Sequence, residues 1–288
     1  MSDNLLHRAH VRRRFARAAA HFSGTDFVHR NSEDGLFERL QPMTIEPSLV
    51  LDLGCGVGAS SRRLQNRFRK SRVLGVDLSP AMLGQAPARG RWFSRNDWVC
   101  ADAQQLPLGQ DSVDLVFANM LMPWIDNPDA LFAEVARVLR PEGLFVFSAL
   151  GPDSLGALRA AWAKVDDTQH VHPFPDMHNL GDGLIRAGMR DPVLDVDELN
   201  ISYKDPSALM KDLAGAGARN SLANRHPGLT GKGRYKRFLE ALQGGREMAE
   251  IVLSLELVFG HAFGGKPRLP DGEFRLSPSQ IGRRKSYN

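Results

Sequence analysis

The residues best suited to chemistry form a glycine-rich loop, Asp-Leu-Gly-Cys-Gly-Val-Gly, at positions 52–58. The loop follows an apolar run at 49–53 and opens a segment with helical spacing at 59–69. Glycines let a backbone turn tightly and approach a ligand, and free amides at a helix start favour polar or anionic groups. The loop alone indicates a nucleotide-like ligand, although a plain glycine-rich turn has the same composition.

Two further carboxylates follow the loop at the ends of predicted strands. Asp77 lies 25 residues after Asp52 and can accept hydrogen bonds from both hydroxyls of a ribose. Asp102 ends the next strand, with Ala103 after it. A single Asp at a strand end is often a cap or turn residue. Three in this order predict one ligand crevice at the carboxyl ends of the strands.

The elements that must hold these residues alternate between short apolar runs and polar segments with helical spacing. Such alternation is typical of parallel strands joined by crossover helices. The predicted strands are 49–53, 72–76, 97–101, 113–118 and 144–149. The predicted helices are 59–69, 80–88 and 128–139, the last followed by a Pro-Glu-Gly turn at 141–143. The sequence predicts an α/β fold with a doubly wound sheet.

The second half has a different texture. Helices are predicted at 152–164 and 179–187, an extended segment at 193–203, and a closing strand at 251–259. The stretch 205–243 has helical parts interrupted by glycines. We expect an N-terminal helical cap at 1–40, an α/β domain at 41–204 and a helical insertion or lid at 205–245. A return to the sheet at 246–270 and a tail at 271–288 complete the chain.

The N-terminal segment predicts an amphipathic helix. Its apolar face consists of Val11, Phe15, Ala18, Ala19 and Phe22, with arginines mostly around the other side. We interpret it as a docking helix. A basic amphipathic start is also compatible with a mitochondrial address, while a secretory signal would need a continuous apolar stretch that is absent.

Bulk properties exclude several classes of protein. Cys55 and Cys100 are the only cysteines in the 288 residues, too few for a disulfide framework, and they suit a reducing cytosol. No apolar run approaches the ~20 residues of a membrane span, so we expect a soluble, cytoplasmic protein. The formal charge of +4 could attract nucleic acid, a membrane surface or an acidic protein. Basic residues are not interleaved with aromatics, which disfavours nucleic acid, and no metal-ligand spacing is present.

Taken in order, the loop, Asp77, Asp102-Ala103 and Asn119 resemble the successive motifs of class I S-adenosylmethionine (SAM) methyltransferases. Nicotinamide enzymes have Gly-x-Gly-x-x-Gly where this loop has Gly-x-Gly-x-Gly. The resemblance implies a mostly parallel seven-stranded sheet and SAM as cofactor. It places Asp77 on the ribose, Asp102 near adenine, and Asn119 near the methionine end. The implied cofactor-binding set is Asp52, Gly54, Cys55, Gly56, Asp77, Leu78, Asp102, Ala103 and Asn119.

Phrases of the second half narrow the resemblance. They are Gly151-Pro152-Asp153-Ser154-Leu155, the segment from His172 to Asp182, and Leu209-Met210-x-Asp212-Leu213 followed by Gly217-Ala218-Arg219-Asn220. These are similar to phrases of the malonyl-acyl-carrier-protein O-methyltransferases of biotin synthesis, as is the N-terminal phrase from Phe15 to Phe22. A Tyr is expected where this chain has Phe22, so no role that needs that hydroxyl is carried over.

Two alternatives stay open, of which the first shares much of this pattern. One is the methyltransferase-like assembly factors of respiratory complex I, with or without modification of a protein arginine. The other is a small-molecule methyltransferase of the quinone type. The His172 to Asp182 phrase favours the malonyl enzymes.

The implied reaction would methylate the free carboxylate of malonyl-acyl carrier protein. A carboxylate is ionised at pH 7, so we assign no catalytic base. Candidates for positioning the substrate are Arg219, Asn220, Arg225, His172 and His178, although a surface Arg is usually solvated. An acidic carrier protein would need a basic face. Two runs of basic residues are candidates for this face, although ordinary solvated helix faces explain both equally well. They are Arg62, Arg63, Arg67, Arg69, Lys70 and Arg72, and separately Lys232, Arg234, Lys236 and Arg237. The sequence does not indicate an oligomeric state.

Overall fold

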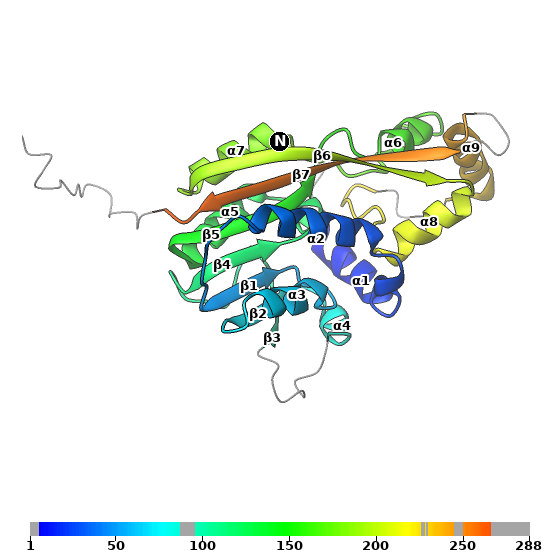
Figure 1. The fold of residues 1–288 in the computed structure, drawn as a ribbon. Coiled ribbons are helices and arrows are strands. Elements are labelled where there is room, and N and C mark those ends of the chain that lie inside the picture. The colour runs from blue at the N-terminus through cyan, green and yellow to red at the C-terminus, as the bar shows by residue number, and fades with distance from the viewer. Residues whose placement is uncertain (1–5, 87–95, 226–227, 229, 245–249, 266–288) are drawn as a thin grey trace, which may run out of the picture.

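The computed structural model describes residues 6–86, 96–225, 228, 230–244 and 250–265. Its centre is a seven-stranded sheet of order β3-β2-β1-β4-β5-β7-β6, in which β7 runs antiparallel to its neighbours (Figure 1). The strands are β1 Leu49–Leu53, β2 Arg72–Asp77, β3 Asn96–Cys100, β4 Val113–Ala118, β5 Leu139–Leu150, β6 Arg190–Tyr203 and β7 Ile251–Phe263. The predicted doubly wound, mostly parallel sheet is confirmed.

Helices cover both faces of this sheet. The helices α5 (Pro128–Val138) and α7 (Met177–Arg186) pack on one face through residues such as Phe132 and Leu184. On the other face lie α2 (Phe27–Leu40) and α3 (Ala59–Arg67), with Leu36 and Leu64 buried. Because both faces are covered, the central strands are apolar along their length rather than alternating.

One predicted turn is a bulged part of a strand. Strand β5 begins at Leu139, so the Pro-Glu-Gly segment lies inside it, with a register shift against β4. Glu142 takes a φ of 64°, and Gly264 N donates to Gly143 O over 2.8 Å. Pairing with the end of β7 therefore extends the strand where local sequence favours a turn. Helix α4 (Pro80–Leu83) is shorter than the predicted 80–88, whose last two residues lie outside the described ones.

Strands β7 and β6, the last two in the sheet order, extend beyond the other strands. Pairing of β5 with β7 ends at Leu150 and Leu257, whereas pairing of β6 with β7 continues to Tyr203 and Ile251. The ribbon beyond β5 carries α6 (Gly156–Ala163), α8 (Pro206–Gly215) and α9 (Lys232–Leu242) around a separate apolar cluster that includes Phe238 (Figure 1). Helix α6, which precedes the predicted insertion, thus packs with it.

The N-terminal cap consists of α1 (Arg8–Ala18), a short 3-10 helix η1 (Phe22–Gly24) and α2. The predicted apolar face of α1 is buried at Val11 and Ala18. A β-bridge joins Leu6 to Leu222, so the cap contacts the insertion directly. The predicted tail at 271–288 lies outside the described residues. None of the described helices is both long and apolar enough to cross a membrane.

Candidate active site

A first cavity lies between the carboxyl ends of the central strands and the N-terminal cap. Eight of the nine predicted cofactor residues line it: Gly54, Cys55, Gly56, Asp77, Leu78, Asp102, Ala103 and Asn119. The ninth, Asp52, is not a lining residue. It is buried beneath the loop, accepts a hydrogen bond from Ser61 Oγ over 2.5 Å, and its pKa is raised by burial to about 7.

The loop between β1 and α3 needs its glycines. Gly54, Gly56 and Gly58 have φ values of 77°, 53° and 77°, a region that side chains strain to enter. A Cβ at Gly58 would lie 2.5 Å from the Trp98 ring. Gly54 N and Cys55 N both donate to Val76 O, which fixes the loop against β2. The backbone is therefore held open toward the cavity.

Asp77 is preorganised by two backbone amides. Gly56 N donates to its Oδ2 over 2.9 Å and Ser79 N to its Oδ1 over 2.8 Å. Burial raises the pKa of Asp77, and these amides oppose that rise. Each carboxylate oxygen accepts one of these bonds and has capacity for a second, and Asp77 lines the cavity, as two adjacent ribose hydroxyls would require.

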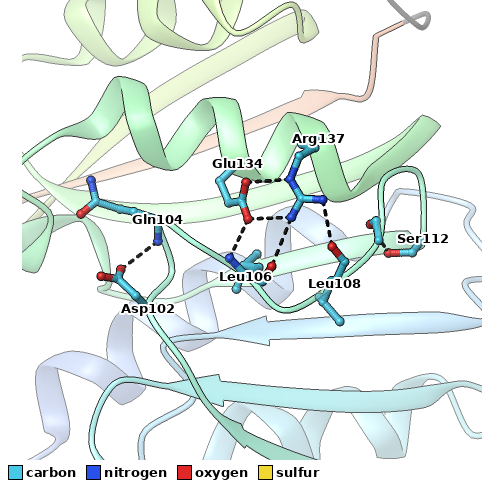
Figure 2. A network of polar contacts seen from close by, with 8 residues as sticks. Asp102, Gln104, Leu106, Leu108, Ser112, Glu134 and Arg137 are labelled. Atoms are coloured by element: carbon cyan, nitrogen blue, oxygen red, sulfur yellow. Dashed lines mark hydrogen bonds and ion pairs between the residues drawn. The ribbon is translucent and has the colours of Figure 1, made fainter.

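Asp102 is positioned by an anchored loop that follows β3 (Figure 2). Glu134 of α5 accepts a hydrogen bond from Leu106 N over 2.6 Å, and Arg137 donates to Leu108 O over 2.8 Å. Arg137 also pairs with Glu134 over 2.7 Å and lowers the pKa of that carboxyl. The network ties the loop to a helix that is packed on the sheet.

Helix α1 reaches across the cavity to this loop. Arg8 Nη1 contacts Asp102 Oδ2 at 2.6 Å, and Arg8 Nη2 donates to Gln104 Oε1 at 2.6 Å. The carboxylate assigned to adenine therefore has a partner in the cap. A bound adenine would share Asp102 with Arg8 or displace it.

Asn119 holds helix α2 over the strand ends. Its Oδ1 lies 2.8 Å from Ser32 Oγ and 3.0 Å from Ser148 Oγ, and its Nδ2 donates to His29 O over 2.9 Å. His29 lines the cavity, and burial lowers its pKa to about 4, so the imidazole is neutral at pH 7. Its Nδ1 is buried without a hydrogen-bond partner among the described residues.

The cap adds two carboxylates that the sequence motifs did not indicate. Asp26 and Glu33 line the first cavity, and burial raises the pKa of each. With Asp77 and Asp102 they outnumber the two lining arginines, Arg8 and Arg30. SAM carries a sulfonium and an ammonium group, so an acidic cavity with a glycine cradle and a ribose carboxylate fits this cofactor.

A second cavity lies between α1 and the helices carried by the β6–β7 ribbon. Its apolar lining includes Leu150, Leu155, Leu158, Trp162, Phe174, Met210 and Leu213. Of the predicted positioning residues, Arg219, Asn220, Arg225 and His172 line this cavity. His178 is exposed at the start of α7, outside this lining.

His172 and Asn220 use their polar atoms to hold the structure together. His172 Nε2 accepts a hydrogen bond from Ser221 N over 2.9 Å, and burial lowers the pKa of this imidazole to about 4. Asn220 donates from Nδ2 to Gln169 O and accepts from Leu222 N, both over 2.9 Å. Both side chains fix the loop after α8, which leaves the arginines as the charged groups facing the cavity.

Trp124 forms the partition between the two cavities and lines both of them. It follows β4 in a short 3-10 helix, Met122–Trp124. Its ring makes edge contacts with Phe15 at 5.0 Å and with His172 at 5.4 Å between centroids. Sequence reasoning missed Trp124, Arg14, His29, Asp26 and Glu33. An aromatic residue shortly after a predicted strand end was the available signal for Trp124.

Comparisons with known proteins agree with this architecture. Residues 51–147 match the family described as Methyltransferase domain. The YcgJ protein of Bacillus subtilis superposes with a TM-score of 0.57 at 15% identity, covering 80% of this chain and 98% of that one. The [4+2]-cyclase SpnF superposes with a TM-score of 0.51 at 18% identity, covering 81% and 82%. A cyclase among the neighbours means that likeness of fold leaves the reaction open.

The fold and the matched domain are those of a class I SAM-dependent methyltransferase. The family is shown by relatives that match nearly the whole chain. The chain is 40% identical to the malonyl-[acyl-carrier protein] O-methyltransferase of Methylovorus sp. (strain MP688), covering 98% of this chain and 97% of the relative. It is 40% identical to the enzyme of that name from Halorhodospira halophila, covering 96% and 95%. The chain belongs to the malonyl-[acyl-carrier protein] O-methyltransferase family.

Proposed function

We propose that this enzyme transfers a methyl group from SAM to the free carboxylate of a malonyl thioester on an acyl carrier protein, in the cytoplasm. The observation that carries the proposal is the pairing of two adjoining cavities of opposite charge. The first is lined by four carboxylates and two arginines. The second is lined by arginines and histidines, with no Asp or Glu among its described lining residues. A cationic donor and an anionic acceptor would each meet a complementary field.

The first cavity would hold the cofactor through residues already placed there. Asp77 would accept hydrogen bonds from the ribose, Asp102 and Leu78 would border the adenine, and the loop glycines would face the methionine part. SAM supplies an electrophilic methyl group on its sulfonium. Glu33, whose Oε1 is buried without a hydrogen-bond partner among the described residues, is a negative group for the cationic end.

Methylation of this acceptor requires no acid–base catalysis by the protein. A malonyl carboxylate, of pKa near 4, is ionised at pH 7, so no group has to remove a proton. His29 and His172 are kept neutral by burial and need no proton-transfer role. Charges of opposite sign are neutralised in the transition state, so water would slow the reaction. Trp124, Phe15 and the cap would exclude water and set the in-line approach.

The position of the second cavity also suits a protein-borne acceptor. Arg234 and Tyr235 of α9 line it, and Lys232, Lys236 and Arg237 of the same helix are exposed. In the other basic run, Arg63 and Arg72 pair with Asp34 and Asp97, and Arg67 donates to Leu40 O. On α9, Lys236 pairs with Glu240, whereas none of the described ion pairs includes Lys232 or Arg237. Helix α9 also borders the second cavity, which the other run does not. We therefore place the docking face for an acidic carrier on α9.

The decisive experiment incubates the purified protein with methyl-labelled SAM and malonyl-acyl carrier protein. We expect a base-labile methyl ester on the malonyl carrier and none on the acetyl carrier, which lacks the free carboxylate. A protein that binds SAM yet leaves malonyl carrier unmethylated would refute the proposal. Rescue of a biotin auxotroph tests the same activity in cells. Co-purification with a respiratory-chain subunit, without carboxyl methylation, would favour the assembly-factor alternative.

A further inference from the structure

Arg14 lies on the wall between the two cavities. Helix α1 carries Val11 and Phe15 toward the first cavity, whereas Arg14 lines the second. Neighbouring positions on one helix face different compartments because successive residues turn by about 100°. Phe15 also contacts Trp124, the partition itself. Arg14 therefore lies on the side of the second cavity that borders the cofactor site.

The guanidinium of Arg14 is held in place with donors to spare. Its Nη2 donates to Asn220 O over 2.8 Å, and Asn220 is in turn fixed to Gln169 and Leu222. Its Nε is buried and has no hydrogen-bond partner among the described residues. A buried donor without a partner costs free energy comparable to a lost hydrogen bond, so such a group is a candidate for ligand binding.

No carboxylate balances this charge in the described part of the chain. Arg14, Arg219 and Arg225 line the same cavity, and none of the described ion pairs includes any of them. Burial lowers the pKa of Arg14, and Arg225 and Arg219 lower it further by repulsion. Arg234 offers a contrast within the same lining, because Asp166 neutralises it. A partly buried cation normally has an anionic partner, and the described residues supply none here.

We propose that Arg14 binds the acyl carboxylate of the acceptor, with Arg219 and Arg225 adding positive charge at the rim. The inference rests on the proposed function and names the group that would orient its nucleophile. The apolar residues of the cavity would surround the thioester arm, and Arg14 would hold the carboxylate on the side toward Trp124. Arginine suits this task because its planar donors match a carboxylate.

The phosphodiester of a carrier's prosthetic arm offers similar anionic chemistry, so the test must separate two sources. Affinities of malonyl carrier and acetyl carrier are measured with the enzyme loaded with S-adenosylhomocysteine. Both carriers have the phosphodiester, and only malonyl has the carboxylate. We expect the wild type to bind malonyl carrier about tenfold or more tightly than acetyl carrier, from a charge-assisted hydrogen bond.

Arg14→Gln should bring that preference close to one while the SAM dissociation constant stays within about twofold. Arg14→Lys should keep part of the preference. The matched control is Arg12→Gln, an exposed residue of the same helix that does not line the second cavity, and it should keep the full preference. Arg225→Gln leaves the Arg14 contact with Asn220 intact and should reduce the preference less. It keeps the test open if Arg14→Gln fails to fold.

An unchanged preference in Arg14→Gln, or no preference in the wild type, would overturn the proposal. Equal weakening of both carriers would assign the arginines to the phosphodiester and overturn the carboxylate assignment. Failure of the proposed function looks different, because the wild type would then leave malonyl carrier unmethylated whatever Arg14 does to binding.

Discussion

The two cavities differ in how the chain builds them. The carboxylates that the motifs placed in the first cavity lie at or just after strand ends, Asp77 as the last residue of β2 and Asp102 after β3, and successive parallel strands bring these ends together. The second cavity collects Arg14 from α1, Trp124 from the loop after β4, and Arg225 from the insertion. The first site follows from topology, while the second depends on packing between distant segments. Their lining charges also differ, which suits substrates of opposite charge.

The largest effect that we expect is on SAM binding and concerns the first cavity alone. Asp77→Ala removes the carboxylate that would hold the ribose and that orders Gly56 N and Ser79 N. Loss of hydrogen bonds to a charged group should weaken SAM binding by about 1.5–3 kcal/mol, or roughly 10- to 150-fold. Calorimetric titration with SAM measures it. Glu38→Gln, an exposed change on α2, is the control. Unchanged SAM affinity in Asp77→Ala would remove the ribose assignment.

The first cavity was the predictable one for a physical reason. A parallel sheet gathers its strand ends at one edge, so locating apolar runs and the polar residue after each was enough to bring Gly54, Asp77 and Asp102 together, while the family resemblance added Asn119. Boundaries were less accurate wherever tertiary pairing overrides local preference. At 141–143 the end of β7 turns a predicted turn into a bulged strand.

The second cavity was not predicted from the sequence; family-like phrases contain Arg219, Asn220 and His172, which were candidates for positioning the substrate. Asn220 and His172 proved to be committed to backbone groups, a fact that depends on the neighbours brought by folding. Arg14 was one of several arginines on an amphipathic helix. Nothing local distinguishes it from exposed Arg13, because its burial comes from the insertion that packs on α1.

The next largest effect concerns the partition. Trp124→Ala should join the cavities, admit water and lower kcat about tenfold, while the SAM dissociation constant changes only a few-fold because Asp77 and the glycine loop remain. Trp124→Phe keeps an aromatic ring against Phe15 and should recover most of the rate. Single-turnover methylation of malonyl carrier measures the methyl-transfer rate of both variants. An alanine variant with the wild-type rate would show that the partition has no role in the reaction.

Acidification should act on His172 of the second cavity and on Asp52 beneath the first in opposite directions. Burial lowers the pKa of His172 to about 4, so its contribution to the free energy of unfolding is full above about pH 6.5 and is lost as the pH falls toward 4. Burial raises the pKa of Asp52 to about 7, so its contribution is full below about pH 4 and is lost as the pH rises through 7. Acid therefore weakens the structure around His172 and favours that around Asp52, while His29 in the first cavity, whose pKa burial also lowers to about 4, opposes Asp52 there.

We expect each effect to be on the order of 1 kcal/mol after relaxation of the surroundings. His172→Gln keeps an acceptor for Ser221 N and should flatten the acid-side loss of stability. Asp52→Asn keeps an acceptor for Ser61 and should flatten the loss between pH 5 and 7. Urea unfolding at several pH values measures these slopes, and amide exchange at Ser221 reports the structure around His172 alone. Parallel slopes in both variants and the wild type would contradict the assignment.

The smallest effect tests how far the first cavity depends on support from outside it. Glu134 touches no predicted cofactor residue, yet with Arg137 it fixes the loop that carries Asp102 (Figure 2). Glu134→Gln keeps one acceptor for Leu106 N but loses the ion pair, so the loop should move more freely. An ion pair that is partly exposed contributes up to about 1 kcal/mol, so SAM binding should weaken about two- to fivefold. Asp129→Asn on the same helix breaks an exposed pair with Arg186 and should leave SAM affinity unchanged. If the two variants behave alike, the loop is held by the sheet alone. The first cavity would then depend on its strand ends even more than the comparison with the second cavity implies.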